Sequence, residues 1–308
     1  MEIDVIIPVY KPGKELFTLM DSLQSQSVPI GNIILMNTEE KFFTQLIYGT
    51  RFMERYKNVK VYHLSKKEFD HGQTRRRGVE RSQAEVFVMM TQDAMPADEH
   101  LIERLTAPLT GDVAVSYGRQ LPTKDCNLIE RYTRSFNYPD KSFVKSAEDL
   151  PRLGIKTYFC SNVCAAYRRD IYDRLGGFVQ RTIFNEDMIY AAGAIKAGYQ
   201  IAYAADARVV HSHNYTHMQQ LHRNFDLGVS QADHPEVFSG VPSESEGKKL
   251  VKNVTAYLKK KHLLNKLPYF YIQCFCKYTG YLLGKNYKRL PGKLVLALTS
   301  NKEYWNKK

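Results

Sequence analysis

Two carboxylates stand side by side in the stretch "FNEDMIY", where Glu186 and Asp187 precede a helical pattern of apolar residues. Adjacent acids at a helix start can simply cap the helix, because the helix dipole stabilises negative charge there. An ionised carboxylate can also take a proton from an incoming hydroxyl group, which is general-base chemistry. The pattern is compatible with both roles.

A second group of residues suits a divalent metal ion. Asp93 follows the apolar run "VFVMM", and His211 and His213 alternate with Ser212 after the run "ARVV". Residues two apart in a strand share a face, so the two imidazoles are expected to point the same way. Carboxylate and imidazole are both ligands for divalent ions. Each residue also has an ordinary alternative: a turn cap for Asp93, and a surface or hydrogen-bonded side chain for each histidine.

Three consecutive arginines occur in "FDHGQTRRRG", residues 69–78. If Thr74 is the N-cap of a helix, Arg75 and the next two arginines occupy its first turn, where the dipole disfavours cations. A bound anion would reverse that cost, because free backbone N–H groups beside guanidinium groups form a diphosphate site. The alternative is three solvated arginines.

The elements that must position these residues alternate between strand and helix patterns. Near-continuous apolar runs separated by amphipathic stretches indicate an α/β fold, with a mostly parallel sheet covered by helices on both faces. Strands are predicted at 4–10, 32–37, 58–64, 85–93, 113–118, 163–168 and 199–213, and helices at 13–26, 41–56, 74–83 and 185–198.

In open α/β sheets, ligands bind beyond the carboxyl ends of the strands. Polar residues follow each of the first four predicted strands, so the candidate residues are expected to gather on one rim of the sheet. These strand ends are residues 8–10, 37–39, 70–72 and 91–93.

The composition indicates a folded chain with a full core, since 44% of its 308 residues are hydrophobic. The N-terminus enters a strand pattern without a signal sequence, so we expect a cytosolic protein. The longest apolar candidate for a membrane span, 267–283, is interrupted by Gln273 and Lys277. Five cysteines without a CxxC pair are expected to be reduced thiols.

Positive charge is concentrated at the C-terminus. Residues 247–308 contain fifteen Lys or Arg and one acid, Glu303, on a chain whose net charge is +12. Such a region could bind an anionic membrane surface or nucleic acid, or could be a solvated helical face. Interleaved Tyr, Phe and Leu favour an interfacial helix.

The ordered motifs resemble those of the inverting glycosyltransferases of family two, which have the Rossmann-like GT-A fold. The branch they resemble is that of the bacterial rhamnosyltransferases of O-antigen and capsule synthesis. The resemblance implies a GT-A catalytic domain at 1–213 and a mainly helical extension at 214–308, basic from about residue 247. It runs from Ile3 to Trp305 and is carried by "VIIPVYK", "FDHGQTRRRG", "TQDAMP", "SNVCAAYRRDIYDRLGGF", "NEDMIYAAGAIKAGYQIAYAADARVVHSH" and "LGKNYKRLP".

The resemblance also assigns roles. Asp187 would be the general base, and Asp93 would hold Mg²⁺ or Mn²⁺ against the donor diphosphate, together with His211 or His213. Ser161, Asn162 and Glu186 would lie near the donor sugar and acceptor, although Ser161 and Asn162 could equally be a polar strand start. The implied donor-binding residues are Pro8, Tyr10, Asn37, Asp70, His71, Thr74, Arg75, Gln92 and Asp93.

The sequence departs from the family pattern at three places. Thr91 replaces the first acid of the Asp-x-Asp motif, which leaves Asp93 as its only carboxylate. Asn37 and Glu39 stand where relatives usually have an Asp followed by small residues, so base recognition is open. Arg76 replaces a common Asn.

The implied reaction is transfer of L-rhamnose from dTDP-L-rhamnose to a saccharide acceptor linked to a lipid diphosphate. The enzyme would lie at the inner face of the cell membrane, held to anionic lipid by its basic extension. One alternative is a family-two transferase that uses another nucleotide-hexose. An alternative of another class is a basic nucleic-acid-binding protein. The transferase interpretation itself expects no nucleic acid as a partner. A nucleotidyltransferase would need more glycine than "PVYKPGKE" offers.

Overall fold

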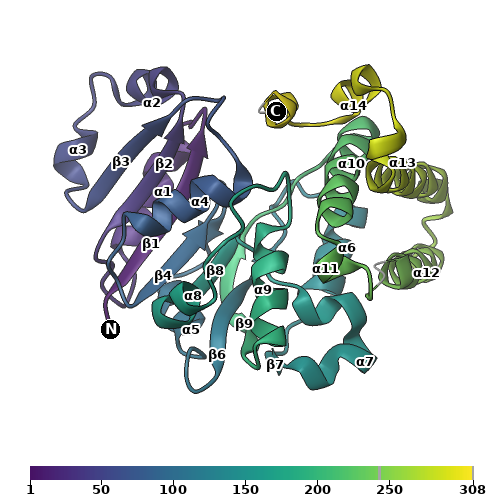
Figure 1. Ribbon diagram of the computed structural model, residues 1–308, viewed down its shortest axis with the longest axis horizontal. Coiled ribbons are helices and arrows are strands. Elements are labelled where there is room, and N and C mark those ends of the chain that lie inside the picture. Colours follow the sequence, from purple (N-terminus) through teal and green to yellow (C-terminus); the bar gives the residue numbers. More distant parts are fainter. Residues whose placement is uncertain (242–243, 307–308) are drawn as a thin grey trace.

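The computed structural model describes residues 1–241 and 244–306, which are built around a nine-stranded sheet (Figure 1). The strand order is β3-β2-β1-β4-β8-β6-β9-β5, and β7 pairs with β9. The strands are β1 (Ile3–Tyr10), β2 (Ile33–Thr38), β3 (Val59–Leu64), β4 (Val86–Met90), β5 (Met95–Pro96), β6 (Val113–Leu121), β7 (Phe143–Lys145), β8 (Cys164–Arg168) and β9 (Gln200–Val210).

The sheet is mixed. Strands β1 to β4 run parallel to one another, while β8 is antiparallel to both of its neighbours, β4 and β6. Strand β6 therefore runs in the same direction as β4, and β9 is parallel to β6. Six strands share one direction and three oppose it, so the carboxyl ends of the six open onto one rim.

Both faces of the sheet are covered, because side chains alternate along buried strands. In β1, Val5 and Ile7 contribute to one hydrophobic cluster, and Ile6 contributes to the other. The first cluster includes α1 (Glu15–Gln24) and α5 (Leu101–Thr106), and the second includes α4 (His71–Glu80) and α9 (Glu186–Lys196). The remaining helices of this part are α2 (Glu40–Ile47), α3 (Phe52–Arg55), α6 (Leu128–Asn137), α7 (Leu150–Leu153) and α8 (Arg169–Arg174).

Two helix predictions were wrong in detail. The helix predicted at 41–56 is divided into α2 and α3, with Gly49 between them at a φ of 69°. Helix α4 begins at His71, so Thr74 is not its N-cap. The cap is Asp70, whose carboxylate accepts hydrogen bonds from the backbone N–H groups of Gly72 and Gln73. The three arginines therefore lie beyond the first turn.

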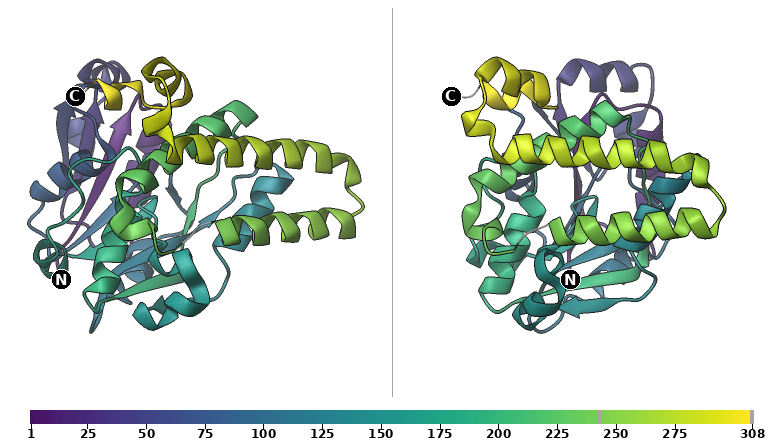
Figure 2. Two further views of the ribbon diagram at one scale, coloured as in Figure 1. Left: turned by 45° about the vertical axis from the view of Figure 1, so that its right-hand side comes forward. Right: turned by 90° about the vertical axis from the view of Figure 1, so that its right-hand side faces the viewer.

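The region after β9 is helical, as predicted. Helices α10 and α13 pack so closely that a side chain at Gly280 or Gly284 would collide with the backbone of Leu221 or Phe225. Helices α12 and α13 extend side by side away from the sheet (Figure 2). The helices are α10 (His217–Asp233), α11 (Pro235–Phe238), α12 (Glu244–Lys260), α13 (Leu267–Lys285), α14 (Gly292–Leu298) and α15 (Lys302–Trp305).

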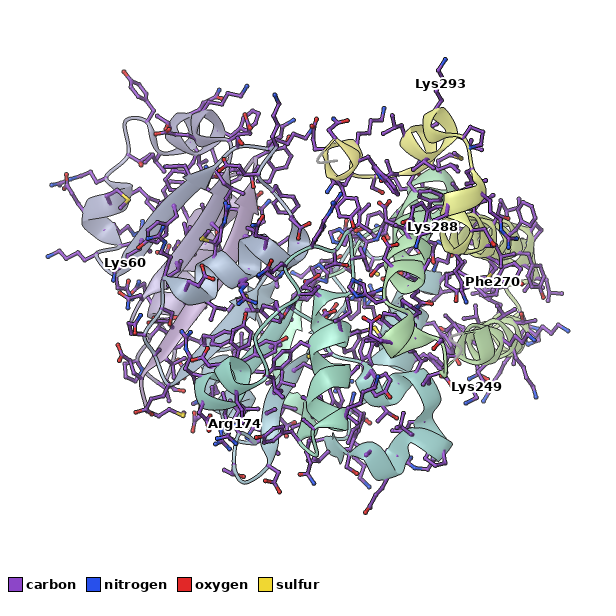
Figure 3. The ribbon with its side chains drawn as sticks, in the orientation of Figure 1. Lys60, Arg174, Lys249, Phe270, Lys288 and Lys293 are labelled. Atoms are coloured by element: carbon purple, nitrogen blue, oxygen red, sulfur yellow. The ribbon has the colours of Figure 1, made fainter. Side chains whose placement is uncertain are left out.

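The surface of this region is basic and partly apolar. Lys293 points away from the body in Figure 3, and Lys288 is 68% exposed. Across the part of the chain that the structure describes, no helix combines the length and apolarity needed to cross a membrane. All five cysteines are free thiols, as predicted.

Candidate active site

The two adjacent carboxylates lie at the first turn of α9, on the rim formed by the strand ends. Asp187 is half-buried, and its Oδ2 accepts a hydrogen bond of 3.0 Å from the backbone N–H of Asn162. Burial raises the pKa of Asp187, and the neighbouring charge of Glu186 raises this pKa further, to about 7. A carboxylate with a pKa near neutrality can accept a proton and release it again, which a general base requires.

Glu186 differs from its neighbour although both are carboxylates. Its Oε1 lies 3.1 Å from Arg75 Nε and accepts a hydrogen bond of 3.1 Å from the Asn162 side chain. Burial raises the pKa of Glu186, but the charge of Arg75, the hydrogen bond from Asn162 and other neighbouring groups together outweigh it, so the pKa stays below its ordinary value. Glu186 is therefore a fixed anion, and Asp187 is the carboxyl that can change its protonation.

The three arginines are used in three different ways. Arg75 is 7% exposed and is committed to Glu186 and to the backbone carbonyl of His71. Arg76 donates to the carbonyls of Gly176 and Phe178. Arg77 lies 3.8 Å from Glu68. The structure thus places these guanidinium groups in contacts within the protein, and a diphosphate contact for Arg75 stays a prediction.

The predicted metal ligands converge. Asp93 Oδ2 lies 3.5 Å from His211 Nε2 and 3.2 Å from His213 Nε2. The three candidate ligand atoms are all within 4.8 Å of one another. Burial raises the pKa of Asp93, but hydrogen bonds from the two histidines hold it well below its usual range. The structure does not choose between His211 and His213, since both reach the carboxylate.

The donor atoms themselves fit a divalent ion. His211 is buried, and its Nδ1 lies 3.0 Å from Gln120 Oε1, which is a pure acceptor. In the neutral imidazole Nδ1 therefore carries the proton, and Nε2 presents a lone pair that suits a cation beside Asp93, whereas a protonated Nε2 would donate to Asp93 directly. Gln120 orients the imidazole as outer ligands of metal sites do.

Gln120 is a site residue that the sequence analysis missed. Its Nε2 donates to Ser161 Oγ at 2.9 Å and to the Tyr138 hydroxyl at 2.6 Å. The next residue, Asn162, holds Asp187. One chain of contacts therefore joins the candidate metal ligands to the candidate base. The only signal in the sequence was a polar residue near the end of a strand that begins as an apolar run.

Most of the remaining predicted donor-site residues make hydrogen bonds within the protein. Asp70 and Thr74 shape the start of α4, because the Asp70 N–H donates to Thr74 Oγ1 at 3.2 Å. The Gln92 side chain pairs with the backbone of Tyr10. Asn37 is fully buried against His63 and does not face the solvent. Pro8, by contrast, is half-buried at the end of β1.

Tyr10 and His71 line a cavity of about 530 Å³ beside the rim. Its opposite wall comes from the C-terminal region, which contributes Arg223 and Thr299 among others. Burial lowers the pKa of His71 to about 4, so its imidazole is neutral. The cavity is large enough for a small-molecule ligand. It lies between the strand ends of the sheet and the C-terminal helical region.

The sequence profile of the family described as "Glycosyl transferase family 2" matches residues 4–176. The chain belongs to this family. Within the family, the chain is 38% identical to the O-antigen chain rhamnosyltransferase RfbN of Salmonella typhimurium, over 99% of this chain and 96% of that protein. It is 36% identical to the O-antigen chain rhamnosyltransferase WbaN of Salmonella anatum, over 98% and 95% of the two chains.

Solved structures confirm the fold predicted for this family-two glycosyltransferase. The mannosyltransferase PcManGT of Pyrobaculum calidifontis, solved with GDP-Man and Mn²⁺, has a TM-score of 0.58 at 14% identity, and the match covers 99% of this chain and 82% of that one. TarS 1-349 of S. aureus, solved with UDP-GlcNAc, has a TM-score of 0.57 at 14% identity, with 97% and 84% covered. The GT-A fold with a helical C-terminal region is confirmed, and the enzyme is a glycosyltransferase.

Proposed function

We propose that this glycosyltransferase moves L-rhamnose from dTDP-L-rhamnose to a saccharide acceptor during O-antigen synthesis, with inversion at the anomeric carbon. The sugar and pathway are supported by two rhamnosyltransferases that are 36% and 38% identical over nearly the whole chain. The observation that carries the mechanism is the placement of Asp187 on the same rim as Asp93 and the two histidines, joined through Gln120.

In this proposal, Asp187 takes the proton of the acceptor hydroxyl as its oxygen attacks the anomeric carbon. The bond to the nucleoside diphosphate breaks on the opposite face of the sugar, so one displacement inverts the configuration. Asn162 and Met188 hold the carboxylate in place through their backbone N–H groups, at 3.0 and 2.8 Å. Ser161 and Asn162 would border the sugar, and Glu186 would stay ionised beside the base.

The leaving diphosphate needs positive charge close to it. Asp93, His211 and His213 would bind Mg²⁺ or Mn²⁺, which supplies charge for the departing diphosphate. Arg75 is proposed to act mainly by fixing Glu186, since its Nε lies against that carboxylate at 3.1 Å.

The nucleotide is proposed to lie in the cavity beside the strand ends, with Pro8 and Tyr10 next to the base. Tyr10 is 39% exposed and packs edge-on against Phe42 at 5.9 Å, so part of its ring is accessible to a ligand. His71 borders the cavity, whereas Asn37, Asp70, Thr74 and Gln92 would act by shaping its wall.

The basic helical region is proposed to bind the inner face of the membrane, where a lipid-diphosphate-linked acceptor would be found. Exposed apolar residues form one stripe along α13, because their spacing of three to four residues places them on one face. Lys266 and Lys285 stand at the two ends of this helix, so an anionic lipid surface suits both features. The stripe consists of Tyr271, Phe275, Tyr278 and Leu282. We place the boundary between the catalytic domain and this extension at residues 213 and 214.

A donor panel tests the proposed function. Purified protein is incubated with Mn²⁺ and with dTDP-rhamnose, UDP-glucose or GDP-mannose, and release of nucleoside diphosphate is measured with and without metal chelation. We expect metal-dependent release from dTDP-rhamnose that Asp187→Asn slows. Release from another donor alone would support the alternative nucleotide-hexose, and release from none would refute the transferase.

A further inference from the structure

The cavity wall opposite the strand ends carries an arginine without a carboxylate partner. Arg223 lies on α10, and among residues 1–241 and 244–306 no ion pair within 4.0 Å involves it. The other arginines near the rim differ, because Arg75 binds Glu186 and Arg134 binds Glu130 at 2.8 Å. A half-buried guanidinium without an anion is costly, so an anionic ligand is the expected partner.

The side chain of Arg223 is nevertheless held in one place. Its guanidinium carbon lies 4.8 Å from the ring centre of Tyr215 and 5.1 Å from that of Phe184. Rings on the face of a guanidinium fix its plane and leave the N–H edge free for hydrogen bonds. Such an arginine is prepared for bidentate contacts with phosphate oxygens.

The position of Tyr215 connects this arginine to the candidate metal ligands. The Tyr215 ring lies 4.9 Å from the His213 ring, and His213 Nε2 lies 3.2 Å from Asp93. Only the rings of Tyr215 and His213 therefore lie between Arg223 and the Asp93 carboxylate. A diphosphate that reaches Asp93 from the cavity would pass along this wall.

The charges at the site leave a role for such a cation. Asp93 is the only carboxylate of its motif, and with one divalent ion the pair carries a single net positive charge. A departing nucleoside diphosphate carries more negative charge than that. Arg75, Arg76 and Arg77 are all engaged within the protein, whereas Arg223 faces the cavity.

We propose that Arg223, from the C-terminal extension, binds the diphosphate of the nucleotide-sugar donor and completes the donor site. This proposal rests on the proposed function. It makes the extension part of the catalytic unit, since the residue that neutralises the leaving group would come from α10 and not from the sheet domain.

Calorimetric binding of dTDP and of thymidine, both with Mg²⁺ present, tests the role of Arg223. Arg223→Gln should weaken dTDP binding by about 10- to 100-fold, because a charge-assisted contact is lost. Thymidine binding should change less than about twofold, since it has no phosphate. Arg223→Lys keeps a charge and should restore part of the affinity, and this variant also serves if the Gln variant does not fold.

Arg51→Gln is the matched control, because the Arg51 side chain is 85% exposed and lies far from Arg223 in the sequence. It should leave dTDP binding unchanged. Equal weakening of dTDP and thymidine by Arg223→Gln, or no weakening of either, would overturn the proposal while leaving the transferase intact. Failure of the wild-type protein to bind dTDP, UDP or GDP would instead overturn both.

Discussion

Replacing Glu186 with Gln is expected to change the pH dependence of sugar transfer. In the wild-type enzyme the pKa of Asp187 is raised, first by burial and then by the charge of Glu186, to about 7. The base must be ionised to act, so kcat/KM should rise with pH and level off above about 7. Removing the negative charge of Glu186 should shift this rise to lower pH.

The size of the shift follows from the charges around Asp187. Two unit charges roughly 8 Å apart interact by about 2 kcal/mol at an effective dielectric constant of about 20, equivalent to about 1.5 pH units. Arg75 also lowers the pKa of Asp187, but it does so equally in the wild type and in the variant. The shift therefore comes from the lost charge of Glu186, and we expect it to be downward by about 1 to 2 pH units.

Two further variants identify the cause. Arg75→Met combined with Glu186→Gln also removes the charge that lowers the pKa of Asp187, so the pH profile should move part of the way back towards that of the wild type. Glu80→Gln removes a carboxylate that is 61% exposed and should leave the profile unchanged. The measurement is kcat/KM from pH 5 to pH 9, roughly the range that brackets the base, at constant ionic strength. A profile that stays in place or moves upward in Glu186→Gln would refute the electrostatic account.

Other perturbations have equally defined outcomes. Asp187→Asn should lower kcat at least about 100-fold, yet raise the melting temperature more at pH 8 than at pH 5, roughly either side of its raised pKa, because burying the ionised carboxylate is costly. Gln120→Leu should weaken Mn²⁺ binding by about 10- to 100-fold in calorimetry, because a metal-binding histidine loses its acceptor. Arg75→Met should cost about 3 to 5 kcal/mol in urea denaturation by leaving Glu186 unpaired, and the double variant with Glu186→Gln should recover most of it. Phe275→Ser should reduce flotation with anionic vesicles, and equal binding of the wild type to neutral vesicles or to DNA would contradict the membrane proposal.

Much of the fold could be predicted because local pattern and tertiary environment agree. The buried parallel strands are continuous apolar runs, so their ends, and with them Asp93 and the two histidines, could be located from sequence. The start of α4 could not, because "FDHGQT" offers two capping residues. Asp70 and Thr74 both make hydrogen bonds in the first turn of α4. Only the folded structure shows that Asp70 is the N-cap.

The roles of the arginines depend on partners that are distant in sequence. Arg76 binds carbonyls about a hundred positions away, at Gly176 and Phe178. Arg75 finds Glu186 only because α4 and α9 begin at the same rim. The sequence shows which residues are charged. Which groups pair with each arginine is decided only when the chain folds. That is why Arg223, with no carboxylate partner among the described residues, was not recognisable in the sequence.

Ligands of α/β sheets bind beyond the carboxyl ends of the parallel strands, but this rule locates only part of the site. The direction of β8 shows why. Ser161 and Asn162 precede β8, so in an all-parallel sheet they would lie at the opposite edge from Asp93. Because β8 is antiparallel, with Cys164 opposite Met90, its beginning meets the end of β4. The reversed strand thus brings the backbone N–H of Asn162 to Asp187 and connects the base to Gln120. A carboxylate held from a reversed strand and metal ligands held from forward strands can face one ligand from two sides, which is the arrangement that an inverting displacement needs.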